Sequence, residues 1–278
     1  MDFSRSFYIP DGTARDRALG RTTHLAIGAH ADDLEIMAFS AIEKCYRARG
    51  KWFGGVTVTS GTGSPRSGAY RKTTNSAMEK IRIREQNRAA DVGRYSFVAQ
   101  LGFSSSSVKT SDNKDLEAQL QWIFENTRPR EIFLHNLADK HDTHVAIALA
   151  SLKALRRAQI PKRNIKVWGC EVWRDLDWLS DDKKGLHYSG DAALSNRLIR
   201  CHRSQVSGGK AYDRAVLGRR QAHAVFFEQH RVDGKAFVNF AMDLSPLIRN
   251  SRMSILGYVR TQMRDFEKDV LTRMGRFL

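Results

Sequence analysis

Short apolar runs and amphipathic segments alternate along most of the chain. Runs typical of buried parallel strands occur at residues 25–28, 53–59, 97–103, 132–134 and 165–172. Between them, apolar residues recur at helical spacing and predict helices over 34–49, 75–93, 116–127 and 145–155. This alternation predicts an α/β fold, a Rossmann-like and mostly parallel sheet flanked by helices in a doubly wound arrangement.

The two ends of the chain differ from this pattern. Residues 1–22 are polar and irregular, which predicts an N-terminal arm, and residues 187–230 read as helical. In the C-terminal segment, Ile255, Val259, Phe266, Val270 and Phe277 recur at roughly helical spacing in a basic helix. Such a stripe is typical of a core or subunit contact. We expect an arm (1–22), one domain (23–245) and a helical C-terminal extension (246–278) that offers an oligomer contact.

Composition indicates a soluble globular protein. The 278 residues are 41% hydrophobic and 27% charged, and no run approaches the roughly 18 apolar residues of a membrane span. Residues 1–5 contain no apolar signal segment. The three cysteines, Cys45, Cys170 and Cys201, are odd in number and widely spaced, which predicts reduced thiols and a cytoplasmic location.

The charge balance is strongly basic. With 46 Lys+Arg against 30 Asp+Glu, the formal net charge is +16, which favours anionic partners. The basic residues are scattered, however, and form no recognisable nucleic-acid-binding module. We therefore prefer a solvated basic surface to a nucleic-acid site, with a basic rim around a pocket for an anionic small molecule as an intermediate interpretation.

Imidazoles and carboxylates follow two of the predicted strands. His30, Asp32 and Asp33 come after 25–28, whereas His135, His141 and His144 come after 132–134. Open α/β sheets bind ligands at the carboxyl ends of their strands, so these two loops are expected to meet. Three His or Asp ligands would hold a zinc ion with one position open, and a neighbouring carboxylate would move protons.

Each fragment also has a simpler interpretation. Asp32 or Asp33 could cap the helix that begins near Leu34, because Asp is a favoured N-cap residue. His30 could be a hydrogen-bonded loop residue, and His141 and His144 could face solvent at a helix start. The occurrence of both fragments at strand ends favours the metal site.

Four segments resemble one enzyme family. Residues 30–35, His-Ala-Asp-Asp-Leu-Glu, are similar to the AHPDDxE motif of the PIG-L (LmbE-like) zinc-dependent de-N-acetylases, and 135–144 is similar to their second motif. Weaker matches are 82–85, where the family often shows R-x-x-E, and 201–205, similar to its H-x-S-Q segment. The resemblance covers about residues 23–225.

The resemblance implies a role for each matching position. It makes His30, Asp33 and His144 the ligands of zinc or another divalent ion. Asp32 becomes the general base, and His141 the residue that stabilises the oxyanion and protonates the leaving amine.

Two positions depart from the family pattern. Ala31 replaces a Pro, and Thr143 replaces an Asp that would orient the catalytic imidazole. Either Asp142 or Asp139 is then expected to orient His141, or His141 titrates lower.

These roles predict a zinc-dependent deacetylase acting on an N-acetylated sugar or sugar conjugate of the N-acetylglucosamine type. The basic charge favours an anionic conjugate. Arg82 is the expected substrate-binding residue, and a surface salt bridge with Glu79 or Glu85 is an equal alternative. One rival is a hydrolase of a non-sugar amide or ester, such as an acylated antibiotic or thiol conjugate. Another is a non-enzymatic nucleic-acid-binding module, which would not need a base beside an open metal site.

Overall fold

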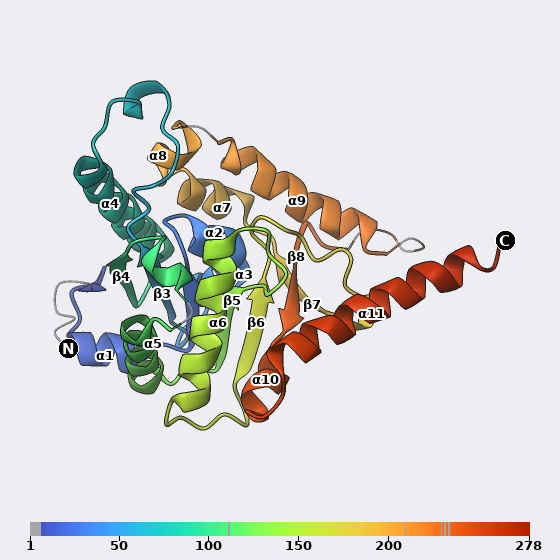
Figure 1. Ribbon diagram of the computed structural model, residues 1–278. Coiled ribbons are helices and arrows are strands. Elements are labelled where there is room, and N and C mark those ends of the chain that lie inside the picture. The colour runs from blue at the N-terminus through green and yellow to red at the C-terminus, as the bar shows by residue number, and fades with distance from the viewer. Residues whose placement is uncertain (1–6, 111, 209, 229, 231, 233) are drawn as a thin grey trace.

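A computed structural model describes residues 7–278 except 111, 209, 229, 231 and 233. The described residues form one eight-stranded sheet, in the order β1-β4-β3-β2-β5-β6-β8-β7, with helices on both faces (Figure 1). The strands are β1 (Phe7–Tyr8), β2 (His24–Gly28), β3 (Phe53–Thr59), β4 (Phe97–Phe103), β5 (Glu131–His135), β6 (Lys166–Cys170), β7 (Lys184–Ser189) and β8 (Phe237–Asp243).

The α-helices are α1 (Arg15–Gly20), α2 (Asp33–Met37), α3 (Phe39–Arg47), α4 (Asn75–Gly93), α5 (Lys114–Thr127), α6 (Asp142–Arg157), α7 (Ala192–Ile199), α8 (Arg203–Val206), α9 (Tyr212–Phe226), α10 (Ser245–Arg249) and α11 (Ile255–Met274). Short 3-10 turns lie at η1 (Gly68–Tyr70), η2 (Ser107–Lys109) and η3 (Asp181–Lys183). Among the described residues, no helix is both long enough and apolar enough to cross a bilayer.

The predicted α/β fold with a mostly parallel sheet is confirmed. Strands β4, β3, β2, β5 and β6 run parallel, while β1, β7 and β8 pair antiparallel at the two sides. The chain moves from β2 outward through β3 and β4, then returns to the other side of β2 with β5 and β6. The switch point between β2 and β5 is where such sheets bind ligands.

Alternate residues of each central strand enter two different cores. Ile27 packs in the core that holds residues of α5 and α6, whereas its neighbour Ala26 packs in the core that holds residues of α3 and α4. Because successive side chains of a strand point to opposite faces, a sheet covered on both sides needs unbroken apolar runs. This requirement explains the runs seen in the sequence.

The structure differs from expectation in several segments. The helix expected over 34–49 is divided at Ala38, whose backbone (φ −115°, ψ 21°) leaves the helical region between α2 and α3. The helical expectation for 187–230 overlaps the end of β7, and its residues 209 and 229 lie outside the described residues. In the expected arm, β1 and α1 form and Leu19 is buried, while residues 1–6 lie outside the described residues. The division into arm, domain and extension remains a prediction.

Candidate functional site

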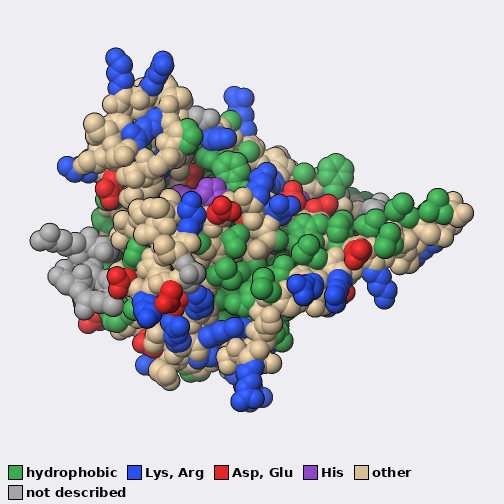
Figure 2. All heavy atoms as spheres, in the orientation of Figure 1, with side chains coloured by type: hydrophobic (Ala, Val, Ile, Leu, Met, Phe, Trp, Pro, Cys, Tyr) green, Lys and Arg blue, Asp and Glu red, His purple; other side chains and the backbone are tan. Residues whose placement is uncertain are grey.

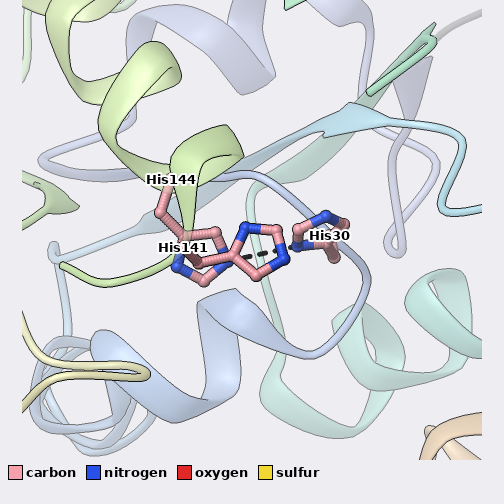
Figure 3. Close-up of side chains that lie close together, drawn as sticks. All are labelled: His30, His141 and His144. Atoms are coloured by element: carbon pink, nitrogen blue, oxygen red, sulfur yellow. Dashed lines mark hydrogen bonds between the residues drawn. The ribbon is translucent and has the colours of Figure 1, made fainter. Parts of the chain in front are cut away.

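Two loops meet at the switch point, one after β2 and one after β5. They bring His30 and His144, 114 residues apart in sequence, to a ring-centroid distance of 5.2 Å, and His30 and His141 to 5.1 Å. Figure 3 shows the three imidazoles gathered between the β2 loop and the start of α6. His30 and His141 are partly exposed, and histidine side chains are visible on the face shown in Figure 2. The two histidine-bearing segments therefore come together at one accessible place.

His30, Asp33 and His144 place one potential metal-ligand atom each at similar distances from one another. Nδ1 of His30 lies 3.4 Å from Oδ2 of Asp33 and 3.2 Å from Nε2 of His144. Nε2 of His144 lies 3.5 Å from the same Oδ2. Tetrahedral zinc with bonds of about 2.0–2.1 Å requires ligand atoms about 3.3 Å apart, so the three atoms fit such an ion.

The carboxylate of Asp33 is fixed by the loop before it. Its Oδ2 accepts hydrogen bonds from the backbone N–H groups of Ala29 (2.9 Å) and His30 (2.7 Å). Gly28 permits this approach, because a Cβ there would lie 2.9 Å from Cβ of Asp33. Burial opposes ionisation of Asp33, but the imidazoles of His144 and His135 hold its pKa well below the usual range. The carboxylate thus binds the loop as an anion.

Asp32 has an unusual backbone and an unpaired carboxylate. Its φ of 91° lies in the left-handed region, which is strained for a residue with a Cβ. It occupies the N-cap position of α2, yet in the part of the chain that the structure describes its side chain makes no capping hydrogen bond, and its buried Oδ2 has no partner. Burial, followed by the charges of Asp33 and Glu35, raises its pKa well above the usual range. The expected capping role is therefore wrong for this side chain, which is available as a base.

His144 is oriented by Asp139. Its Nδ1 lies 3.2 Å from Oδ2 of Asp139, and both side chains are buried. Because a carboxylate accepts hydrogen bonds, this contact places the proton on Nδ1 and leaves the Nε2 lone pair facing His30 and Asp33. Burial lowers the pKa of His144 to about 4, so the ring is neutral as a metal ligand must be.

His141 lacks the expected carboxylate partner. Asp139 bonds its backbone N–H (3.2 Å) rather than its ring, and Asp142 is exposed at the start of α6. Counting only the described residues, the buried Nδ1 of His141 has no hydrogen-bond partner. Burial, followed by the charge of His30, lowers the pKa of His141. Of the two expectations, orientation by Asp139 or Asp142 is wrong, while the lower titration agrees with the structure.

The ring of His141 is held by stacking instead. It stacks on His144 at 4.5 Å and lies 6.2 Å from the Trp173 ring at an angle of 26°. Its ligand atom also lies within 4.8 Å of those of His30 and His144, so this geometry allows it to be a ligand as well.

His135 is a site residue to which the sequence analysis gave no role. It is fully buried, it stacks on His144 at 3.8 Å, and its Nε2 lies 3.3 Å from Asp33. These three residues form a second cluster with metal-ligand spacing. Nε2 of His135 also lies 2.9 Å from the backbone nitrogen of Ala29, whose N–H it shares with Oδ2 of Asp33. The arrangement suits a positioning residue beneath the loop.

Arg82 is buried and its guanidinium joins three segments. It is 3% exposed and donates to the carbonyl of Gly61, the hydroxyl of Ser64 and Oε1 of Gln205 (3.1 Å). Gln205 in turn donates to the carbonyl of Ala31 (3.2 Å). The alternative of a surface salt bridge is therefore wrong, and the R-x-x-E and H-x-S-Q segments meet beside the loop after β2.

A second buried network supports α2. Glu35 is fully buried and accepts hydrogen bonds from Gln86 (2.9 Å) and Tyr95 (2.7 Å), while its Oε2 lies 3.0 Å from Nε2 of His202. Glu85 accepts from the backbone N–H and hydroxyl of Ser204. The motif positions Glu35 and His202 are thus structural partners, which only their distant pairing in the fold reveals.

Aromatic and basic side chains from later segments form one wall of the site. The Trp173 ring lies 6.3 Å from the Tyr212 ring, and Nζ of Lys210 lies 5.2 Å from the Trp173 ring centroid. Burial, followed by the charges of Asp32 and Asp33, raises the pKa of Tyr212. The periodicity of the sequence gave no signal for this wall.

Comparison with known families agrees with the sequence resemblance. Residues 25–155 match the family model of PIG-L, described as GlcNAc-PI de-N-acetylase. This segment contains all of the histidines and carboxylates at the switch point. The resemblance to PIG-L is therefore confirmed. A comparison with curated proteins found no match.

Solved structures share the fold at low sequence identity. N,N'-diacetylchitobiose deacetylase from Pyrococcus horikoshii superposes with a TM-score of 0.64 at 14% identity, covering 83% of this chain and 86% of that one. GalB, a 4-carboxy-2-hydroxymuconate hydratase from Pseudomonas putida, gives 0.61 at 17% identity, covering 80% and 95%. The A40926 pseudoaglycone deacetylase Dbv21 gives 0.57 at 15%, covering 80% and 97%. These similarities establish the fold.

Proposed function

Taking the PIG-L match over residues 25–155 as the premise, we propose that this protein is a metal-dependent de-N-acetylase of an N-acetylated sugar or sugar conjugate. One observation carries the proposal. Ligand atoms of His30, Asp33 and His144 lie 3.2–3.5 Å from one another, beside the buried, unpaired carboxylate of Asp32. A binding module has no need of this combination.

His30, Asp33 and His144 would hold the metal in this proposal. Zinc, or another divalent ion, would supply a Lewis acid for the amide carbonyl and lower the pKa of water at the site to about 7. Asp139 keeps the Nε2 lone pair of His144 directed at the ion, and His135 supports the loop that carries Asp33.

Two groups move protons in the proposed reaction. Asp32 accepts a proton from the attacking water, because its carboxylate is buried and not used in hydrogen bonds to the described residues. His141, in its protonated form, donates a hydrogen bond to the developing oxyanion and then gives its proton to the leaving nitrogen, so that the amine departs neutral with acetate as the other product. Asp32 releases the proton taken from water to solvent, and His141 takes up a proton from solvent before the next turnover. The stacked rings of His144 and Trp173 hold the His141 ring in place.

The wall of Trp173, Tyr212 and Lys210 supports a sugar substrate. An aromatic ring can cover the apolar face of a pyranose, and the ammonium of Lys210 adds a positive charge suited to an anionic conjugate. The names of two structural neighbours give N,N'-diacetylchitobiose and the A40926 pseudoaglycone as compounds that they deacetylate, which is compatible with a sugar or a sugar conjugate as the substrate here. We propose that Arg82 contributes to substrate binding by holding the Gly61–Ser64 loop against Gln205.

The test combines metal analysis with acetate release. Purified wild type, Asp32→Asn and His144→Ala would be assayed on N-acetylglucosamine, its phosphate and N,N'-diacetylchitobiose. We expect wild type to bind about one ion and release acetate. Asp32→Asn should keep the metal and lose about 10²–10⁴-fold in rate, while His144→Ala should lose the metal. Asn suits the left-handed backbone at this position, so the variant isolates the proton step.

Other outcomes would contradict parts of the proposal. A wild-type rate of hydrolysis by Asp32→Asn would rule out Asp32 as the general base, and unchanged metal content in His144→Ala would rule out His144 as a ligand. Release of acetate only from non-sugar acyl compounds would favour the antibiotic or thiol-conjugate alternative. Steeply salt-dependent nucleic-acid binding without metal would favour the non-enzymatic module. Equal activity on the neutral and phosphorylated sugars at all salt concentrations would remove the preference for an anionic substrate.

A further inference from the structure

Helix α11 packs against the rest of the described protein over its first half, up to Phe266, whose ring lies 6.4 Å from that of Trp178. Ile255 and Tyr258 pack against the core, Gln262 is buried, and the Tyr258 hydroxyl donates to the carbonyl of Asp243. From residue 267 to 278 every side chain is exposed, and Figure 1 shows the helix extending away from the sheet toward the C-terminus. Beyond Phe266, the residues of α11 are therefore not buried against the described body of the protein.

Apolar residues nevertheless continue along this helix with heptad spacing. They lie three and four residues apart in turn, at Leu256, Val259, Met263, Phe266 and Val270, and Arg273 takes the last position of the repeat within the helix. We call these six positions the α11 seam. Residues of the seam line a groove with a cavity volume of about 720 Å³, which Arg260 and Glu267 also line. Leu256 is 78% exposed and Met263 58% exposed.

Such a helix is expected to require a partner. A helical segment of about 12 residues is marginally stable alone in water, and a contiguous exposed apolar stripe such as that from Leu256 to Val270 marks an interaction surface. Figure 2 shows hydrophobic side chains along the C-terminal extension formed by α11. Positions three and four apart are those that interlock in two-helix coils, so another helix is the occupant that fits the stripe.

We propose that the α11 seam pairs with the α11 seam of a second copy of this chain, in an antiparallel arrangement. An antiparallel pair can place Leu256 opposite the partner's Arg273, Val259 opposite the partner's Val270 and Met263 opposite the partner's Phe266. The same register sets Arg260 against the partner's Glu267 on both sides of the two-fold axis. The seam is thus complementary to itself in shape and in charge.

The other arrangements are less favourable. In a parallel pair Arg273 would face its own copy within the seam, and Arg260 would not meet Glu267. An anionic lipid surface would accept the basic residues, but Glu267 on the border of the groove and Asp269 beside it would oppose binding. Antiparallel pairing leaves Arg273 at the end of the seam, where Asp269 of the same helix already contacts it at 2.9 Å. This inference goes beyond the proposed function and does not depend on it.

The first test measures mass in solution. Sedimentation equilibrium of the full chain should give twice its 31.6 kDa. Met263→Glu and Val270→Glu should weaken association at least about tenfold, because each places a carboxylate within the seam. Thr261→Glu, which adds the same charge at an exposed position outside the seam, should leave it unchanged. Circular dichroism would confirm that each variant is folded. A monomeric wild type, or dimers that persist in both seam variants, would overturn the proposal.

The second test fixes the direction of pairing. Arg260→Glu and Glu267→Arg should each weaken the dimer, and the double variant should restore it. Leu256→Cys with Arg273→Cys should cross-link between copies, whereas Leu256→Cys alone should not, since the two sulfurs would be about 25 Å apart. Cross-linking by Leu256→Cys alone would show the parallel form and contradict the proposal. Binding of wild type to vesicles of anionic phospholipid, lost in Met263→Glu while the protein stays monomeric, would replace it with a membrane contact.

Discussion

Oδ2 of Asp139 lies 3.2 Å from Nδ1 of His144, while Nε2 of the same ring lies 3.2 Å from Nδ1 of His30. Nδ1 of this imidazole thus contacts a buried carboxylate, and Nε2 lies close to the other proposed ligand atoms. Asp139→Asn keeps an acceptor for the ring and removes the charge. We expect metal affinity to fall about 10–100-fold, measured by zinc titration against a competing chelator. Asp142→Asn, in an exposed neighbour, is the control, and equal affinities of the two variants would refute the role.

His141 can be distinguished as a proton donor or a ligand. If it donates protons, His141→Ala should retain wild-type metal content and release acetate about 10²–10⁴-fold more slowly. The ring is near His30 and His144, so loss of the metal from this variant would show instead that His141 binds the ion. Metal content by mass spectrometry and the initial rate of acetate release would decide between them.

Arg82→Lys tests the guanidinium that joins three segments. A lysine has a single charged nitrogen and cannot reach Gly61, Ser64 and Gln205 together. We expect the free energy of unfolding to fall by about 1–3 kcal/mol and KM to rise more than kcat falls. Arg84→Lys, at an exposed position of the same helix, should behave as wild type. A wild-type KM in Arg82→Lys would show that Arg82 does not contribute to substrate binding.

Arg220 of α9 holds α2 in place through hydrogen bonds to its backbone carbonyls. Its fully buried guanidinium donates to the carbonyls of Glu35 and Ile36 (2.9 Å each) and to the hydroxyl of Ser195 (2.6 Å). Arg220→Met would leave these acceptors unpaired, and we expect a loss of about 2–4 kcal/mol in urea unfolding. Arg214→Met, exposed on the same helix, is the matched control. Stability equal to that control would show that other groups satisfy the carbonyls.

Glu131 gives a prediction for acid pH. Its contacts with His24 and Lys44 lower its pKa to about 2, so its ionised form stabilises the fold above its unfolded pKa of 4.5. That stabilisation is lost as pH falls from about 4.5 toward 2. Glu131→Gln should be less stable at pH 7 by on the order of 1 kcal/mol, because the side chain is 25% exposed. The difference from wild type should narrow at pH 3. If the stability difference between wild type and Glu131→Gln were the same at pH 7 and pH 3, ionisation of Glu131 would not contribute to stability.

The sequence predicted the central architecture because its signals were strong. The uninterrupted runs of β2, β3 and β5 follow from burial on both faces, and α4 has the expected bounds of Asn75–Gly93. The last residues of β7 lie within the helical expectation for 187–230, because this strand is mostly polar and half-buried and lacks the alternation of a one-sided strand. Local pattern does not determine such edge strands.

At the site, the loops were predictable but the partners were not. His30 and His144 each follow a predicted strand, and this placement predicts that they lie close together, because parallel strands have their carboxyl ends at the same edge of the sheet. The pairing of Asp139 with the His144 ring rather than with that of His141 depends on loop geometry, which leaves no periodic signal. The burial of Arg82 likewise depends on Gln205, 123 residues away.

The wall formed by Trp173, Lys210 and Tyr212 lies outside the segment that matches the family. Residues 25–155 contain the proposed ligands and proton-transfer groups, whereas the aromatic and basic side chains beside them come from residues 173–212. In the proposed function, the bond-breaking groups and this part of the substrate wall thus come from separate stretches of the sequence. Exchange of the later stretch between homologous enzymes should redirect the choice of acceptor while leaving the bond-breaking apparatus intact.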